Sequence, residues 1–164
     1  MTVYFEMDRV LCDFATQADR YRILKKNSCV NWLKVFLIGS KFWSEMEFFP
    51  GTNEYFFKVR EYCIKRKVDV KILSSVRLLS GRLGKMKWCR RNLCLGKKDV
   101  ILVNRAEKKA LFASHFSLLI DDNEKNVNGF IRNGGHGYKF VSWNDECYKE
   151  IIKTIDFVCN GECV

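Results

Sequence analysis

Short runs of apolar residues alternate along the chain with longer segments whose apolar residues recur at helical spacing. Short apolar runs are typical of buried strands, and recurrence every three or four residues is typical of amphipathic helices. The pattern predicts five strands, at Val3–Phe5, Val68–Leu73, Val100–Val103, Ser117–Ile120 and Tyr138–Val141.

Helical segments are predicted between these strands and after the last one. Strands that alternate with helices indicate an α/β fold with a doubly wound parallel sheet. The segment before Pro50 is helical or irregular, and Thr52 and Asn144 are expected as N-caps. The helical segments are Asp13 to about Lys26, Val30–Phe49, Thr52 to Lys65–Lys67, Gly84–Leu93, Lys108–Ser114, Asn123–Asn133 and Asn144 to about Val158.

The composition fits one globular domain over residues 1–164. Hydrophobic residues make up 48% of the chain and there is a single proline, which excludes a disordered or collagen-like chain. The longest apolar stretch, Val30–Ser40, is interrupted by Asn31 and Lys34, so no membrane span is expected. Acidic residues in Met1–Val10 argue against a signal peptide, and a cytoplasmic location is expected.

The chain contains eight cysteines. Its length, apolar core and expected lack of a signal favour reduced thiols over a disulfide framework. No Cys-x-x-Cys occurs and neither histidine has metal-ligand spacing to a cysteine, so zinc is not expected. The cysteines are Cys12, Cys29, Cys63, Cys89, Cys94, Cys147, Cys159 and Cys163.

The positive charge is concentrated in the middle of the chain. The formal net charge is +10, and residues 51–100 carry 14 Lys/Arg and only 4 Asp/Glu. Such an excess, here between Lys58 and Lys98, attracts phosphate-bearing partners, including nucleic acid. The alternative, given equal weight, is that these basic residues form solvated helix surfaces that keep the protein soluble.

Polar side chains follow three of the predicted strands. Ligands of open α/β sheets bind at the carboxyl ends of the strands, so these side chains are expected to converge. Grouped carboxylates favour a hard cation such as Mg²⁺, and hydroxyls with a lysine suit phosphoryl transfer. Taken singly, each pair has the alternative of a turn or helix cap. The pairs are Glu6 and Asp8, Ser74 and Ser75, and Asp121 and Asp122, with Lys108 or Lys109 before the fourth strand.

Four ordered motifs resemble the haloacid-dehalogenase-like (HAD) phosphatase superfamily, and in particular its 5′(3′)-deoxyribonucleotidase branch. That branch opens with a strand followed by Asp-Met-Asp-Gly-Val-Leu-Ala-Asp-Phe. The chain reads Tyr4-Phe-Glu-Met-Asp-Arg-Val-Leu-Cys-Asp-Phe14. The other three motifs match Ile72–Ser75, Lys109–Ala113 and Leu118–Asp122.

The resemblance implies a HAD-like Rossmannoid core with a small helical cap, at about residues 15–50, inserted after the first strand. It further implies a Mg²⁺-dependent phosphatase that acts on nucleoside monophosphates, or on another small phosphomonoester, through an acyl-phosphate intermediate. Because members of the branch often pair, a homodimer is also compatible with it.

The resemblance also assigns roles by position. Glu6 falls at the nucleophile and metal-ligand position, and Asp8 at the acid/base position, whose backbone carbonyl also meets the metal. The matched roles are phosphate binding for Ser74, Ser75 and Lys109 (Lys108 in the competing register), metal binding for Asp122 with Asp121 beside it, and a base pocket of Phe14, Phe42 and Trp43, which Phe48 and Phe49 extend unless they are core.

Two residues depart from the family pattern. Glu6 stands where the family has aspartate, and its extra methylene displaces the carboxylate by about an ångström, a shift that can cost about 10²-fold in rate. Arg9 stands where the family has glycine, so it either blocks the pocket or clamps a phosphate. Three functions stay open: an altered phosphatase, a pseudo-enzyme that binds a phosphorylated ligand, and a nucleic-acid binder that uses the basic 58–98 region.

Overall fold

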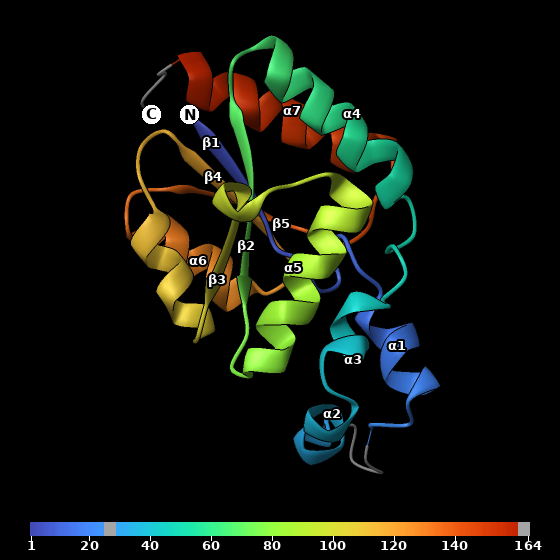
Figure 1. Cartoon of the computed structure of the whole chain (residues 1–164). Helices are drawn as coiled ribbons and strands as arrows, with labels where there is room; N and C mark the ends of the chain where they lie inside the picture. The colour runs from blue at the N-terminus through green and yellow to red at the C-terminus, as the bar shows by residue number, and fades with distance from the viewer. Residues whose placement is uncertain (25–28, 161–164) are drawn as a thin grey trace.

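The computed structural model describes residues 1–24 and 29–160, and its centre is a parallel sheet (Figure 1). All strand pairs run parallel, so the chain crosses over one face of the sheet between successive strands. The strands are β1 (Thr2–Phe5), β2 (Asp69–Ser75), β3 (Val100–Val103), β4 (Ser117–Asp121) and β5 (His136–Lys139).

The strand order is β3-β2-β1-β4-β5, which places β1 at the centre. Phe5, the last residue of β1, lies opposite Ile72 of β2 and Ile120 of β4. The order reverses at β1, because the chain first extends the sheet on one side and then on the other. This is the predicted doubly wound parallel sheet, and it brings the carboxyl ends of β1, β2 and β4 together.

Helices cover both faces of the sheet, because alternate residues of β1 point to opposite faces. Phe5 belongs to the main core, which includes residues of α4, α5 and α7, whereas Tyr4 packs on the other face with Phe112 of η2 and Phe130 of α6. The helices are α1 (Phe14–Arg20), α2 (Trp32–Ile38), α3 (Ser40–Ser44), α4 (Thr52–Lys65), α5 (Leu79–Leu93), α6 (Glu124–Arg132) and α7 (Asp145–Asn160), with short 3₁₀ helices η1 (Lys97–Asp99) and η2 (Ala106–Phe112).

Helices α1, α2 and α3 lie beyond the carboxyl edge of the sheet, at the lower right of Figure 1. Apart from Phe14, the first residue of α1, they fall within the segment 15–50 that was expected as a cap. Helix α3 approaches α5 closely at Gly84, where an added Cβ would lie 2.6 Å from the Cβ of Trp43 and closer still to the carbonyl oxygen of Ser40. A side chain larger than hydrogen at Gly84 would therefore force the two helices apart.

Several predicted boundaries shift. Thr52 is not an N-cap: Gly51 takes that position with φ of 82°, and the Thr52 hydroxyl donates to the carbonyl of Val10. Helix α5 begins before Gly84, because the segment from Leu79 continues the same helix. The segment predicted as helical from Lys108 is the 3₁₀ helix η2, which begins and ends about two residues earlier.

The two polar strand ends are also longer than predicted. Strand β2 includes Ser74 and Ser75, and β4 includes Asp121, because these residues continue the ladder with β3 and β5. Strand β5 begins two residues before the predicted Tyr138. The segment expected as helical to Lys26 is helical to Arg20, and Lys25 and Lys26 lie outside the described residues.

No helix in the described part of the chain has both the length and the apolar character to span a membrane. Cys163 lies outside the described residues. The free thiols in the structure include Cys12, Cys63, Cys89, Cys94, Cys147 and Cys159.

Candidate functional site at the carboxyl edge of the sheet

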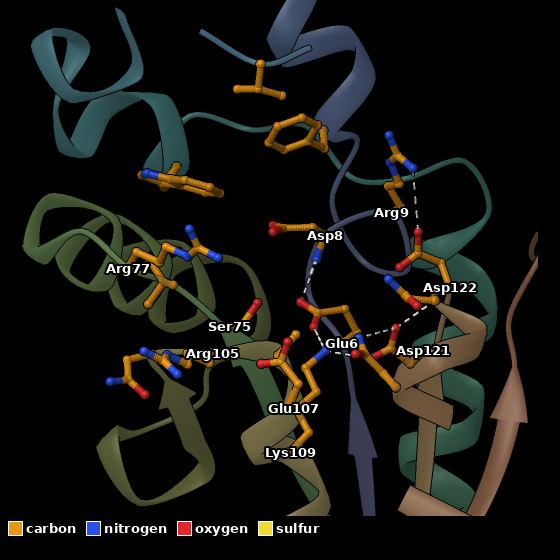
Figure 2. A pocket seen from close by; sticks show the side chains of 18 of the residues that line it. Glu6, Asp8, Arg9, Ser75, Arg77, Arg105, Glu107, Lys109, Asp121 and Asp122 are labelled. Carbon is orange, nitrogen blue, oxygen red and sulfur yellow. Dashed lines mark hydrogen bonds and ion pairs between the residues drawn. The ribbon is translucent and has the colours of Figure 1, made fainter. Parts of the chain in front are cut away.

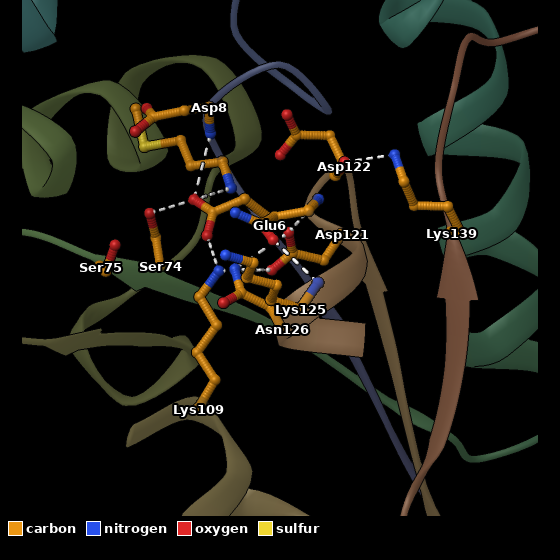
Figure 3. Close-up of polar contacts among 12 residues, drawn as sticks. Glu6, Asp8, Ser74, Ser75, Lys109, Asp121, Asp122, Lys125, Asn126 and Lys139 are labelled. Carbon is orange, nitrogen blue, oxygen red and sulfur yellow. Dashed lines mark hydrogen bonds and ion pairs between the residues drawn. The ribbon is translucent and has the colours of Figure 1, made fainter. Parts of the chain in front are cut away.

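Glu6 lies at the centre of the polar cluster, directly after β1, and its side chain is buried (Figure 3). Its Oε1 accepts hydrogen bonds from the backbone N–H of Met7 at 2.8 Å, the N–H of Asp8 at 3.2 Å, and the hydroxyl of Ser74. Its Oε2 pairs with Lys109. Burial alone would raise the pKa of Glu6, but Lys109 and Lys85 outweigh it and hold that pKa below its usual range, so the carboxylate is ionised.

Lys109 joins two acidic residues from different strands. Its Nζ pairs with Glu6 and lies 2.5 Å from Oδ2 of Asp121. Burial would lower the pKa of Lys109, but the two carboxylates raise it above its ordinary value. Lys108 points elsewhere and is exposed, so η2 presents Lys109 to the site.

Asp8 is held by a second buried lysine, Lys85 of α5. The Nζ of Lys85 donates to Oδ2 of Asp8 at 2.8 Å, to the hydroxyl of Ser74 at 2.7 Å, and to the carbonyl of Ser75 at 3.1 Å. The same ammonium group lies 4.8 Å from the ring centre of Trp43. Burial, with Glu6 nearby, raises the pKa of Asp8 although Lys85 opposes the shift, and its Oδ1 is buried without a hydrogen-bond partner among the described residues.

Asp121 is the last residue of β4 and Asp122 follows it, but the two have different surroundings. Asp121 is buried and accepts hydrogen bonds from the N–H of Asn123 at 2.8 Å and the side-chain amide of Asn126 at 3.0 Å, besides its bond to Lys109. Asp122 is partly exposed, and its Oδ2 lies 3.8 Å from the guanidinium of Arg9. Burial, with Asp121 and Glu6 beside it, raises the pKa of Asp122 to about 6.

The two serines also separate in position. Ser74 is fully buried and links Glu6 to Lys85, so its hydroxyl is already used inside the protein. Ser75 is half-buried and lines the cavity above the cluster. Of the two hydroxyls expected to bind phosphate, Ser75 alone borders the cavity.

A cavity of about 660 Å³ opens above the cluster and extends toward the helices of the 15–50 segment. Figure 2 shows the acidic residues and Lys109 on its floor and aromatic rings above them. Of the residues predicted for a base pocket, Phe14 and Trp43 line this cavity, and so does Trp32. Phe42 is buried behind the wall instead, where its ring packs 5.6 Å from that of Phe14 and 5.0 Å from that of Trp43.

Phe48 and Phe49, the residues suggested to extend the base pocket, do not line it. The ring of Phe48 packs against Trp88 at 5.2 Å, and that of Phe49 packs against Phe140 at 5.8 Å. Both residues pack against the main core. Phe48 and Phe49 therefore serve as ordinary core residues, the alternative given for them in the sequence analysis.

The residues as arranged do not fit Mg²⁺. Within residues 1–24 and 29–160, no three His, Cys, Asp or Glu side chains are grouped so that they could hold a metal ion. Both oxygens of Glu6 are occupied by donors, and Lys109 stands between Glu6 and Asp121. Figure 2 shows the carboxylates of Asp8 and Asp122 pointing to opposite sides of the cavity. The negative charge is neutralised by lysines in this arrangement.

Lys85 was not among the predicted site residues, although it is as deeply buried as Lys109. It is one of 14 basic residues between positions 51 and 100, so the composition gave no reason to distinguish it from the others. Its spacing was the available signal: Gly81, Gly84 and Trp88 lie on the same buried side of α5. A lysine on the buried side of a helix requires a partner, and here that partner is Asp8.

The fold and site together define an α/β protein with a doubly wound parallel sheet and a buried acid–lysine cluster at its carboxyl edge. No protein-family model matches the chain, and no curated protein matches it. Some solved structures have folds similar to that of this chain. One is the HAD domain of the effector protein Lem4 from Legionella pneumophila, with a TM-score of 0.49 and 9% identity over 99% of this chain and 97% of that one.

A second similar structure is a HAD family enzyme from Bacteroides thetaiotaomicron. Its TM-score is 0.47 and its identity 12%, over 88% of this chain and 95% of that one. That protein is an aspartate-to-alanine mutant in complex with magnesium and inorganic phosphate.

Proposed function

We propose that the protein is a HAD-like phosphomonoester hydrolase in which Glu6 is the nucleophile and Asp8 the general acid and base. The carrying observation is that these two carboxylates lie two residues apart and are held by different buried lysines, Glu6 by Lys109 and Asp8 by Lys85. Their pKa values are displaced in opposite directions, down for Glu6 and up for Asp8. A carboxylate that ionises readily beside one that takes up a proton more readily suits attack and proton transfer, respectively.

In this mechanism an oxygen of Glu6 attacks phosphorus, and the bond between phosphorus and the ester oxygen breaks. Asp8 gives its proton to that leaving oxygen. Water then attacks the phosphorus of the acyl phosphate, Asp8 takes the proton from the water, and the carboxylate of Glu6 is released. Lys85 and Lys109 stabilise the negative charge, and Ser75 donates to a phosphate oxygen.

A nucleoside monophosphate is the proposed substrate. Support comes from the rings of Phe14, Trp32 and Trp43, which line the cavity above the acidic floor. Aromatic faces stack on nucleobases, so these rings suit the base of a nucleotide. Mg²⁺ is the cofactor that the sequence resemblance implies, and its requirement is part of the test below.

Binding of a phosphorylated ligand without turnover is the second candidate. Glu6 favours it, because three donors occupy its Oε1 and Lys109 occupies its Oε2. A nucleophile in this state has to release a donor before it can approach phosphorus. The basic residues around the cavity would bind the phosphate whether or not the reaction follows.

Phosphate release from a panel of nucleoside monophosphates and an aryl phosphate, with Mg²⁺ or with EDTA, separates the candidates. Turnover by the wild type that is lost in Glu6→Gln and kept in Glu47→Gln, an exposed glutamate of the 15–50 segment, supports the hydrolase. Loss of that turnover in EDTA would establish the metal requirement. A silent wild type with an active Glu6→Asp variant would overturn hydrolysis and support the binding function. Unchanged turnover in Glu6→Gln would exclude Glu6 as nucleophile.

A further inference from the structure

A second cavity, of about 740 Å³, adjoins the first. The two share four lining residues, namely Arg77, Asn104, Arg105 and Glu107. Lys108, the alternative to Lys109 in the predicted lysine motif, also lines the second cavity. The cavity above Glu6 and the second cavity therefore border one another at these four residues.

The second cavity carries uncompensated positive charge. Arg77, Arg105 and Lys108 are exposed. None of these three forms an ion pair with a carboxylate within 4 Å in the described parts of the chain. Glu107 is the one acidic residue in its lining. By contrast, the lysines of the first site, Lys85 and Lys109, are already paired. The free cations are therefore available to an anion from outside.

These residues are placed where ligands of such sheets bind. Arg77 follows β2 and precedes α5, while Arg105 lies between β3 and η2, so both come from the carboxyl ends of adjacent strands. Figure 2 shows Arg77 and Arg105 on the side of the cavity opposite Asp121 and Asp122. A guanidinium group binds two phosphate oxygens at once, and two such groups suit one phosphate dianion.

We propose that Arg77, Arg105 and Lys108 bind a second phosphate of the substrate while the first lies over Glu6. This rests on the proposed function, because the two phosphates belong to one molecule. The shared chemistry is a nucleotide with a second phosphate, either as a small bisphosphate or as the next phosphodiester of a strand whose end carries the first. Helix α5 begins beside Arg77 and has no acidic residue, with Arg82, Lys87, Arg90 and Arg91 exposed along it.

Calorimetric titration of the wild-type protein tests the second phosphate. The two ligands are the 5′-phosphonate analogue of adenosine monophosphate and the same analogue with a 3′-phosphonate that stands in for the 3′-phosphate, so neither carries an ester that the proposed hydrolase could cleave. We expect the 3′-phosphonate to tighten binding about tenfold or more, in keeping with charge-assisted hydrogen bonds. That advantage should fall to about onefold in the triple variant R77Q/R105Q/K108Q. It should persist in K149Q/K153Q, which removes two exposed lysines of α7 that line neither cavity.

Equal affinity for the two ligands in the wild type, or an advantage that survives in the triple variant, would overturn the second phosphate site. Failure of both ligands to bind would overturn it as well. An advantage that disappears in the triple variant supports the site even if the wild type releases no phosphate, an outcome that would refute hydrolysis alone. Phosphate release by a wild type that binds the two ligands with equal affinity would support hydrolysis and refute the second phosphate site.

A tetranucleotide with a 5′-phosphonate end identifies the source of the second phosphate. If a strand is the source, it binds more tightly than the small bisphosphate analogue, its affinity falls steeply with salt, and R82Q/K87Q/R90Q weakens it. If a small bisphosphate is the source, the tetranucleotide gains nothing over it and the variants of α5 leave both affinities unchanged. Both results support a second phosphate site.

Discussion

The ammonium group of Lys85 lies 2.8 Å from Oδ2 of Asp8, and its side chain is completely buried. Lys85 therefore orients the residue that we propose transfers protons, and its bond to Ser74 extends the same control to Glu6. The second lysine, Lys109, joins Glu6 to Asp121. The site is thus a single connected network in which each buried carboxylate has a lysine.

Lys85→Met should destabilise the protein strongly. The substitution keeps an unbranched side chain of similar length but leaves Asp8 without its positive partner, and breaking a buried pair in this way costs about 3 kcal/mol or more. Urea denaturation would measure the loss of unfolding free energy. Lys87→Met is the matched control, because Lys87 is exposed on the same helix and should change stability little. Equal effects of the two variants would show that the pair with Asp8 contributes nothing.

Arg9→Gly should stabilise the protein by about 1 kcal/mol. Arg9 has a φ of 62°, in the left-handed region where a side chain costs about 1–2 kcal/mol relative to glycine. Its 3.8 Å ion pair with Asp122 is largely exposed and contributes little. Arg9→Ala is the control, because it removes the same ion pair but keeps a Cβ at the strained position. A thermal melt in which both variants behave alike would contradict the role of backbone strain.

The Asp122 carboxyl should make stability fall as pH rises from about 4 to 6. Burial raises its pKa from the usual 3.8 to about 6 in the folded protein, so in this range the folded state holds a proton that the unfolded state has released. Stability is therefore greatest below the unfolded pKa and declines as pH passes the folded value. Asp122→Asn removes this contribution, so urea midpoints should favour the variant increasingly from pH 4 to pH 7. A constant difference between the two proteins across that range would exclude the effect.

Gly84→Ala should cost about 1–3 kcal/mol, because the new methyl group would overlap Ser40 and Trp43 and push α3 away from α5. Gly129→Ala in α6 is the opposite case, since nothing lies within 4 Å of its added Cβ. Alanine there should stabilise the helix by about 1 kcal/mol through propensity alone. Denaturation of both variants measures the contrast, and two changes of the same sign would disprove the close approach of α3.

The sheet was predictable from the sequence because β1 to β4 each contain a short apolar run that ends at a polar or turn residue. All five predicted strands agree with the structure within two residues at each end, and β5 is displaced by two residues toward His136. Local signals were weaker at η2, where a 3₁₀ helix gives no 3.6-residue repeat. Thr52 was misassigned because its hydroxyl bonds to Val10, a contact that depends on tertiary structure.

The position of the site was predictable, but its internal bonding was not. Residues at the carboxyl ends of β1, β2 and β4 converge because the sheet topology requires it. Whether a hydroxyl faces the cavity or the interior depends on the register of β2, and that register buries Ser74 and leaves Ser75 at the cavity. Phe42 and Trp43 are adjacent in sequence, yet α3 turns Trp43 to the cavity and Phe42 into the core.

Glu6 and Lys109 are 103 residues apart in the chain, and Glu6 and Ser74 are 68 apart. During synthesis Glu6 emerges long before Lys109, and the central strand β1 completes its pairing only after β4 has been synthesised. Contacts of such long range form slowly, because the chain must close large loops first. A nascent chain that ends before η2 therefore lacks one of the two lysines that hold Glu6 ionised, so the Glu6–Lys109 pair forms only after three of the five strands have been synthesised.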